Sequence, residues 1–255
     1  MKSMAKDGGI SKWRLFRLAC RCLFLQSSWN YKHFQGLGWS VALLPEVKAI
    51  YAPRHLPQVL KRYCKYFNTN TFLAPAVAAA TLCLEVDQSQ GRNVVMEPHT
   101  YPDAVMAPVA AVGDALFWGG IRPFLSCLAV ALGAFGFCWS PIVLIVLFNL
   151  PAAIFRVVGT WLGYQHGASV VMLIQRWRLA DAAILLKRCT VVVCGGLCAV
   201  LMHQGQLGLL WSTIVSVLVI VSLFAAIVCL RKGVPIVVVL LGIIATVAMV
   251  DKLLL

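Results

Sequence analysis

The feature that most constrains this chain is the stretch from Cys189 to Leu230, which contains no Asp, Glu, Lys or Arg. A helix of about 42 residues would be roughly 60 Å long, twice the thickness of a bilayer core. One helix cannot occupy that length, and the polar run His203-Gln204-Gly205-Gln206 divides it into two spans. Because Lys187-Arg188 and Arg231-Lys232 flank its ends, both ends should lie on one side of the membrane. The stretch therefore predicts an out-and-back helical hairpin.

A third apolar segment of about 17 residues, Val234 to Val250, follows the second basic pair. It should run outward and leave residues 251–255 on the far side. Across the chain 61% of residues are apolar, 12% are charged and the mean hydropathy is +0.85. These values exceed those of soluble domains and predict a polytopic, all-α membrane protein.

The middle of the chain has shorter apolar segments. The region from Pro123 to Phe155 lies between Arg122 and Arg156 and is cut by Trp139-Ser140-Pro141 into two pieces of about 15 residues. Each piece is short for a full span, which predicts a re-entrant hairpin, a structure tolerated only where protein or a wet cavity satisfies the backbone. Transporters place binding sites at such broken helices. An ordinary pair of tilted spans is the alternative.

Positive charge is concentrated in residues 1–70, which hold twelve Lys and Arg against Asp7 and Glu46, a net charge of about +10 out of +13. This region should face the cytoplasm and anionic lipid, and the polar, basic start of the chain predicts a cytoplasmic N-terminus without a cleaved signal peptide. Two amphipathic segments, Lys12–Gln26 and Leu56–Phe67, should lie in the interface or pack on the membrane body. Their large apolar residues argue against nucleic-acid binding.

These observations predict three regions: a basic interfacial region over 1–70, a core with the re-entrant hairpin over 71–188, and a three-span anchor over 189–255. The ten cysteines are scattered, mostly within apolar runs, and we interpret them as small buried hydrophobes. The five histidines form no ligand pattern. Since there is also no phosphate-binding glycine loop, hydrolase elbow or carboxylate pair, we predict no metal, no cofactor and no catalytic residue.

The first polar group that could bind a substrate lies at residues 26–39, where amide, hydroxyl and aromatic side chains crowd together. Sugar hydroxyls need amide or carboxylate partners, and aromatic faces cover the apolar side of a sugar ring. We therefore predict sugar contacts from Trp29, Asn30, Gln35 and Trp39. A polar loop with interfacial aromatics is the alternative.

Two further groups lie beside the middle hairpin. Asp114 and Arg122 flank Gly119-Gly120, so Asp114 could accept sugar hydroxyls or neutralise Arg122 across a break in the helix. Asn149 precedes Pro151, and its carboxamide could cap a break or face the pathway. For both residues the structural alternative stays open.

Five segments occur in the order typical of one family: SSWNYKHFQGLGW, LLPEVKAIY, KYFNTNTFLAP, VGDALFWGGIRP and LFNLPAAIFRVVGTWLGYQHG. The chain thus resembles the IID subunit of the mannose-family (mannose/fructose/sorbose) sugar phosphotransferase system. The resemblance implies a non-phosphorylated permease subunit of the bacterial cytoplasmic (inner) membrane. It implies hetero-oligomers with a IIC membrane subunit, separate cytoplasmic IIA and IIB phosphocarriers, and a hexose substrate. Within these segments, Asn68 and Trp118 join the predicted sugar contacts.

The chain also departs from the family pattern. Lys32 stands where the family usually has a glutamate, and 107–111 read Ala-Pro-Val-Ala-Ala where a Gly-Pro-Leu-Ala-Gly is typical. The connection near His203–Leu207 is short, and the acidic residues after the Asn-Thr segment are reduced to Glu85 and Asp87. Loss of an acceptor at a sugar site would weaken or change selectivity. The alternative is a divergent subunit with a regulatory or assembly role.

Overall fold

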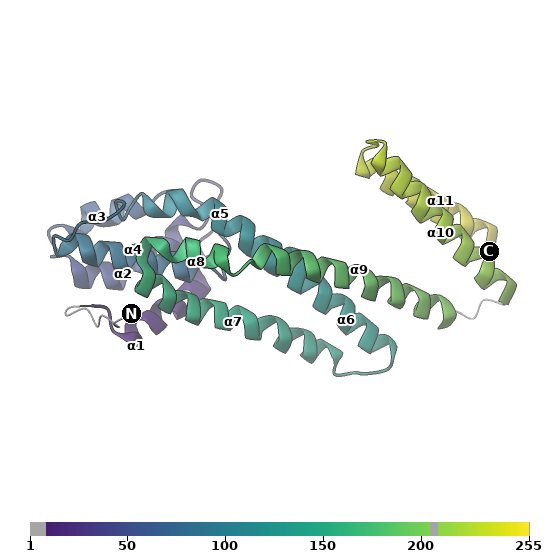
Figure 1. The fold of residues 1–255 in the computed structure, drawn as a ribbon, viewed down its shortest axis with the longest axis horizontal. Helices are drawn as coiled ribbons and strands as arrows, with labels where there is room; N and C mark the ends of the chain where they lie inside the picture. The colour runs from purple at the N-terminus through teal and green to yellow at the C-terminus, as the bar shows by residue number, and fades with distance from the viewer. Residues whose placement is uncertain (1–8, 205–208, 255) are drawn as a thin grey trace. The chain divides into compact units, whose positions relative to one another are not determined.

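The protein is described here by a computed structural model over residues 9–204 and 209–254, which form helices and loops with no strand (Figure 1). Contacts divide the chain into two units, 1–194 and 195–255, with the boundary inside α9. The helices of the first unit are α1 (Lys12–Arg21), α2 (Gly36–Ile50), α3 (Leu56–Tyr63), α4 (Ala74–Ser89), α5 (Tyr101–Leu116), α6 (Arg122–Ala134), α7 (Ser140–His166), α8 (Val170–Arg176) and the start of α9 (Leu179–Gln204).

Helix α4 is the centre of the first unit and is buried from Ala74 to Val86. It packs most extensively on α7 and also contacts α1, α2, α5 and α8. Its alanines let neighbours approach closely, and α7 presents Gly159 and Gly163, four residues apart, to Ala76. Small residues at this spacing are typical of close helix pairs in membranes. Small side chains on α4 and α7 therefore allow the close contact between these two helices.

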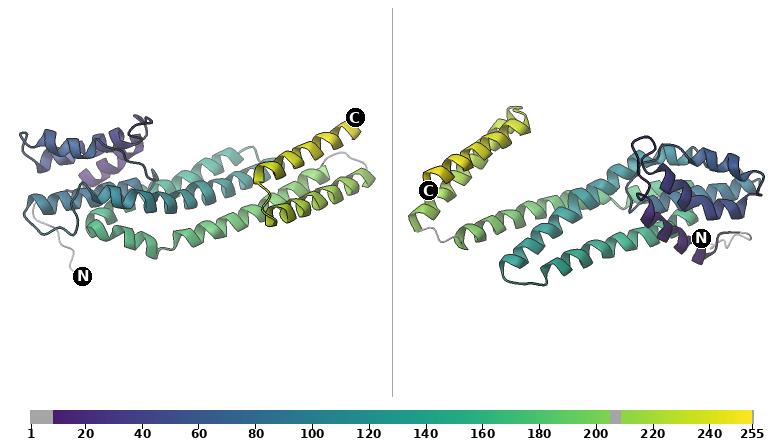
Figure 2. Two further views of the ribbon diagram at one scale, coloured as in Figure 1. Left: turned by 90° about the horizontal axis from the view of Figure 1, so that it is seen from above. Right: turned by 180° about the vertical axis from the view of Figure 1, so that it is seen from behind.

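Helices α5 and α6 form one continuous helical segment through a π-helical turn, Phe117–Ile121. The Arg122 N–H donates to the Phe117 carbonyl, five residues back, and Pro123 supplies no N–H of its own. A chain reversal at residues 135–139 then leads into α7, which packs against α6 (Figure 2). The reversal ends at Trp139, the first residue of the predicted interruption, and Ser140 and Pro141 begin α7.

The two middle helices are longer than the two apolar pieces of about 15 residues, and the re-entrant hairpin stays a prediction. The segment Tyr101–Ala134 has 34 residues and α7 has 27, so neither ends at Arg122 or Arg156. The helices continue because Gly119-Gly120 is accommodated as a π turn and Pro151 lies within α7. Among the described residues, two helical stretches are long and apolar enough to cross a bilayer, Tyr101–Ala134 and Ser140–Leu201.

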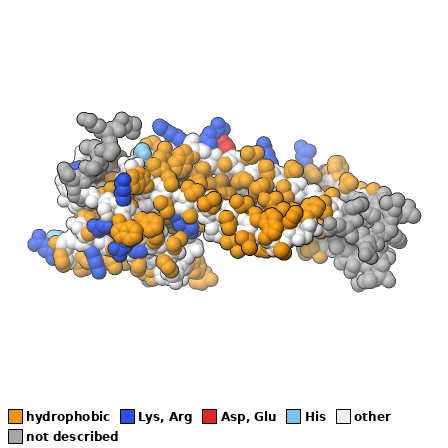
Figure 3. Space-filling model, turned by 90° about the horizontal axis from the view of Figure 1, so that it is seen from below, with side chains coloured by type: hydrophobic (Ala, Val, Ile, Leu, Met, Phe, Trp, Pro, Cys, Tyr) orange, Lys and Arg blue, Asp and Glu red, His pale blue; other side chains and the backbone are white. Residues whose placement is uncertain are grey.

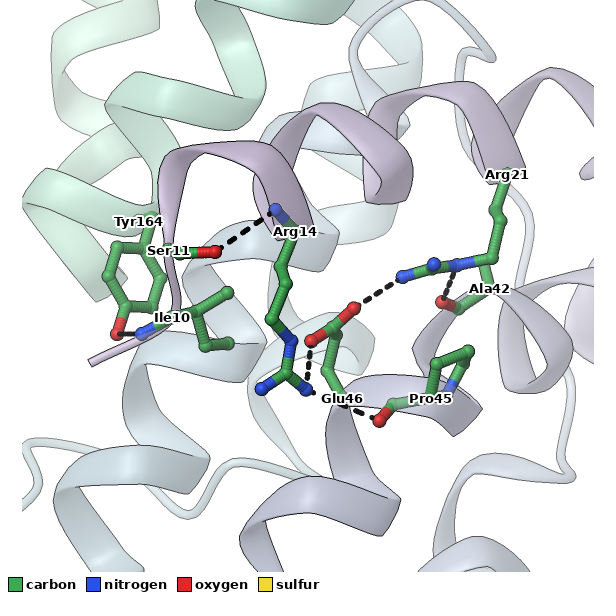
Figure 4. Close-up of polar contacts among 8 residues, drawn as sticks. All are labelled: Ile10, Ser11, Arg14, Arg21, Ala42, Pro45, Glu46 and Tyr164. Carbon is green, nitrogen blue, oxygen red and sulfur yellow. Dashed lines mark hydrogen bonds and ion pairs between the residues drawn. The ribbon is translucent and has the colours of Figure 1, made fainter. Parts of the chain in front are cut away.

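Helix α1 is attached to the core on one side only. Leu15, Leu18 and Ala19 are buried, whereas Trp13 and Phe16 are exposed. Arg14 Nη2 and Arg21 Nη2 lie 2.5 and 2.7 Å from the two carboxylate oxygens of Glu46 on α2 (Figure 4). The Ile10 N–H also donates to the Tyr164 hydroxyl of α7 at 2.8 Å. The N-terminal helix thus joins α2 and α7.

Helix α3 packs on the body of the unit, as its amphipathic pattern predicts, and buries Val59 and Tyr63. The hydroxyls of Tyr51 and Tyr63 both donate to the carboxylate of Glu85 on α4. The pKa of both tyrosine hydroxyls is raised above its usual value, mainly by burial and to a smaller extent by the neighbouring Glu85 carboxylate. The two tyrosines therefore remain protonated donors at physiological pH.

The second unit contains the end of α9 together with α10 (Leu209–Arg231) and α11 (Ile236–Leu254), which contact each other. Helices α9, α10 and α11 correspond to the three C-terminal apolar segments. Helix α9 ends at Gln204, and residues 205–208, which include part of the predicted polar turn, lie outside the described residues. The membrane direction of these helices stays a prediction.

The interpretation of the cysteines as buried holds for Cys22 and Cys83, whereas Cys64, Cys138, Cys194 and Cys198 are exposed. Burial raises the pKa of the Cys22 thiol to about 12. Because the thiolate is the nucleophile, we expect a maleimide at pH 8 to label Cys64 and leave Cys22 unmodified in the folded protein. Peptide mass spectrometry before and after denaturation checks this. Labelling of Cys22 in the folded protein, at the rate of Cys64, would contradict the structure.

Candidate functional site

The 26–39 segment consists of a compact loop over 26–35 and the first residues of α2. The Asn30 Oδ1 accepts from the N–H groups of Lys32 and His33 at 3.1 and 2.9 Å, and its Nδ2 donates to the Ser28 carbonyl at 3.2 Å. Asn30 thus closes the turn with its own side chain, a common role of asparagine. Trp29 is partly exposed, with its ring edge-on to Tyr31 and Phe34.

Gln35 and Trp39 lie inside the protein. The Gln35 carboxamide donates to the Thr69 carbonyl at 2.8 Å and accepts from the Thr69 N–H at 3.1 Å, and the residue is only 2% exposed. The Trp39 ring stacks on Phe67 at 3.9 Å. These contacts attach the 26–39 loop to the 67–70 segment.

The 67–70 segment in turn contacts α5. The Asn70 Nδ2 donates to Asp114 Oδ1 at 2.8 Å, while its Oδ1 accepts from the Phe72 N–H at 3.0 Å. An added Cβ on Gly113 would lie 2.4 Å from the Asn70 side chain, so glycine permits this approach. Asn68, two residues earlier, is half-buried, and its carboxamide has no hydrogen-bond partner within residues 9–204 and 209–254.

Asp114, Trp118 and Arg122 form an exposed row along the helix, four residues apart. The Arg122 guanidinium lies over the Trp118 ring at 5.4 Å, while Asp114 is bonded to Asn70. The ion pair between Asp114 and Arg122 that the sequence allowed is therefore replaced by two separate contacts. The helix between them turns through a π segment, a feature frequent at functional sites.

An aromatic cluster supports this row. Trp118 contacts Phe72 and Phe148 with ring centroids 5.5 and 6.0 Å apart, and Phe117 is fully buried behind them. The Arg156 guanidinium of α7 lies over the Phe72 ring at 4.5 Å. We call Asn70, Phe72, Asp114, Trp118, Arg122, Phe148 and Arg156 the Asp114 cluster.

Lys187 of α9 lies next to the π turn, since a Cβ on Gly119 would be 3.4 Å from its Nζ. Three cationic side chains, from α6, α7 and α9, thus lie against the aromatic rings of the cluster or beside its π turn. Sequence reasoning missed Asn70, Phe72, Arg156 and Lys187 as partners. A charged residue within an apolar segment, as Arg156 is, was the available signal.

Asn149 lies apart from these contacts. It is exposed in the middle of α7, and its Nδ2 donates to the Ile145 carbonyl of the same helix at 2.8 Å. The helix does not break at this point, so the predicted capping role is wrong.

A family profile described as "PTS system mannose/fructose/sorbose family IID component" matches residues 9–254. The mannose-specific EIID component of Escherichia coli K12 is 30% identical over 154 residues, which cover 59% of this chain and 54% of that protein. The fructose permease IID component of Bacillus subtilis is 27% identical over 170 residues, 66% of this chain and 62% of that protein. The chain thus spans little more than half the length of the curated relatives it matches.

Solved structures show the same fold. A chain from the cryo-electron microscopy structure of the mannose transporter ManYZ with a microcin aligns with a TM-score of 0.59 and 22% identity, covering 93% of this chain and 94% of that one. A chain described as a membrane protein aligns with a TM-score of 0.68 and 23% identity, covering 92% and 94%. The match over residues 9–254 shows that this chain belongs to the mannose/fructose/sorbose family of phosphotransferase-system IID components.

Proposed function

We propose that this chain is the IID permease subunit of a sugar phosphotransferase system in the bacterial cytoplasmic membrane. With a IIC subunit it forms the sugar pathway, and separate IIA and IIB proteins phosphorylate the hexose. The subunit itself is not catalytic. The observation that carries the proposal is the exposed row of Asp114, Trp118 and Arg122 in a chain of this family.

Within this proposal, Asp114 accepts hydrogen bonds from sugar hydroxyls and Arg122 donates hydrogen bonds to sugar oxygens. Trp118 covers the apolar face of the sugar ring. Asn68, two residues before Asn70 in the chain, has a carboxamide without a hydrogen-bond partner among the described residues. Trp29 offers a second exposed ring at the 26–39 loop. Asn30, Gln35 and Trp39 act by holding that loop, and Asn149 faces outward, available to the IIC partner.

The basic region suits the cytoplasmic side of the membrane. Figure 3 shows many Lys and Arg side chains on the part of the first unit that holds α1–α3, others along one edge of the long helices, and apolar side chains over the rest of those helices. Such a surface attracts anionic lipid and offers a docking face for a phosphorylated IIA or IIB domain. The proposal therefore has the N-terminus in the cytoplasm.

The test measures uptake and phosphorylation of labelled mannose, glucosamine and related sugars. It compares cells that carry this gene with cells that lack it, with the IIC, IIA and IIB partners present in both. Loss of uptake without the gene is expected. Unchanged uptake of every sugar would reject the transport function.

Asp114→Ala is expected to lower sugar affinity about tenfold or more, because a hydrogen bond to a charged group contributes about 1.5–3 kcal/mol. The measurement is the sugar concentration for half-maximal uptake, with copurification of IIC as the assembly readout. Asp181→Ala is the matched control, since that carboxylate is exposed and paired with Arg178. Equal affinities of the two variants would remove Asp114 from the sugar site.

A second candidate function, regulation or assembly without sugar contact, is favoured by Lys32, which is exposed where the family usually carries a glutamate. Neighbouring genes distinguish the two. A IIC gene with phosphocarrier genes supports transport, whereas a regulator gene without IIC supports regulation.

A further inference from the structure

Two apolar grooves run along α7, one on each side of an exposed strip. The first, about 210 Å³, lies between α4, α7 and α8, with Ala76 and Gly159 among its walls. The second, about 270 Å³, lies between α1 and α7, with Phe16 and Trp161 among its walls. Val158 lines both grooves, so they adjoin across α7.

The strip between the grooves is apolar and uncovered within the described part of the chain. Ile154 is 51% exposed, Val157 45% and Val158 44%. Along α7 the first groove extends from Ile154 to Leu162, a rise of roughly 12 Å, and the second from Val157 to Trp161, a rise of roughly 6 Å. Because the two apolar grooves are separate and adjoin at Val158, they suit two flexible chains more than one compact ligand.

A cationic group lies at one end of the second groove. Lys12 Nζ lies over the Trp161 ring at 4.9 Å, and no carboxylate pairs with Lys12 in residues 9–204 and 209–254. Lys12 is also the first residue of α1, whose N-terminus carries partial positive charge. An anionic group is therefore stabilised at this end by a side chain and by the helix.

We propose that an anionic diacyl phospholipid binds across α7, with one acyl chain in each groove and its phosphate beside Lys12. The site depends on the membrane placement proposed above and not on sugar transport. Burial of the acyl chains selects no lipid over another, because the surrounding tails are equally apolar. Selection comes from the headgroup, where one Lys near the surface contributes about 1 kcal/mol, which corresponds to a roughly fivefold preference for anionic over zwitterionic lipid.

The test uses the full chain in nanodiscs of equimolar phosphatidylglycerol and phosphatidylethanolamine, each in turn carrying a photoactivatable group in one acyl chain. Crosslinks are mapped by peptide mass spectrometry. We expect labelling of the peptides that contain Val158, roughly fivefold stronger with phosphatidylglycerol. Lys12→Gln should abolish the preference, and Val158→Trp, which fills both grooves, should abolish the labelling.

Two control variants make the result decisive. Arg17→Gln removes the same charge from an exposed position of α1 that lines neither groove, and Ile145→Trp adds the same bulk at an exposed position of α7 outside them. Both should retain labelling and preference. The proposal would be overturned if the two lipids labelled the protein equally, or if Arg17→Gln and Lys12→Gln had equal effects. It would also be overturned if the labelling disappeared once IIC was added. Sugar uptake is not a readout, so failure here leaves the proposed function untouched.

Discussion

Replacing Glu46 by alanine is expected to destabilise the protein by about 3–5 kcal/mol and to detach α1 from the core. Glu46 is 1% exposed and is the shared partner of Arg14 and Arg21. Without the carboxylate, two guanidinium groups face each other at a partly buried position with no counter-charge. Thermal unfolding in detergent measures the loss of stability. Limited proteolysis, with cleavage sought in the segment that follows α1, measures the detachment of α1.

Two comparisons test the cause. Asp181→Ala removes a carboxylate from an exposed pair with Arg178, and we expect a change of about 1 kcal/mol or less. Replacing Arg14, Arg21 and Glu46 together by apolar residues of similar volume should recover much of the stability, because no uncompensated charge remains. A Glu46→Ala protein as stable as Asp181→Ala would show that the triad does not hold α1.

Gly163→Ala is expected to cost about 3 kcal/mol by separating α7 from α4. The added Cβ would lie 2.2 Å from the Ala76 carbonyl oxygen and 2.9 Å from its carbon, and both helices would have to shift because the overlap is with backbone. Overpacking of this kind costs about 1–3 kcal/mol, and α4 is the most buried helix of the first unit. Thermal unfolding and yield of the folded protein measure the effect.

Gly195→Ala is the matched control for this substitution. Gly195 also lies inside a helix, but a Cβ there would meet no atom within 4 Å. Alanine should then stabilise α9 by about 1 kcal/mol through its higher helix propensity. If the two variants changed stability equally, close contact between α7 and Ala76 would not be what stabilises the core.

The sequence by itself determined the helical membrane body, the chain reversal near Trp139-Ser140-Pro141 and the family. Apolar periodicity, charge spacing and turn residues are local properties, so they can be read without knowing which helices meet. For the same reason, the amphipathic pattern of residues 56–67 sufficed to place α3 against the core.

Only the tertiary structure decided how long the middle helices are and which polar residues are available to a ligand. Gly119-Gly120 and Pro151 look like breaks in sequence, yet the helices continue through them. The Gln35 carboxamide is hydrogen-bonded to Thr69, 34 residues away, and the Asp114 carboxylate is hydrogen-bonded to Asn70, 44 residues away. Composition cannot reveal such partners, because a carboxamide or carboxylate has the same chemistry whether it binds a substrate or the protein's own chain.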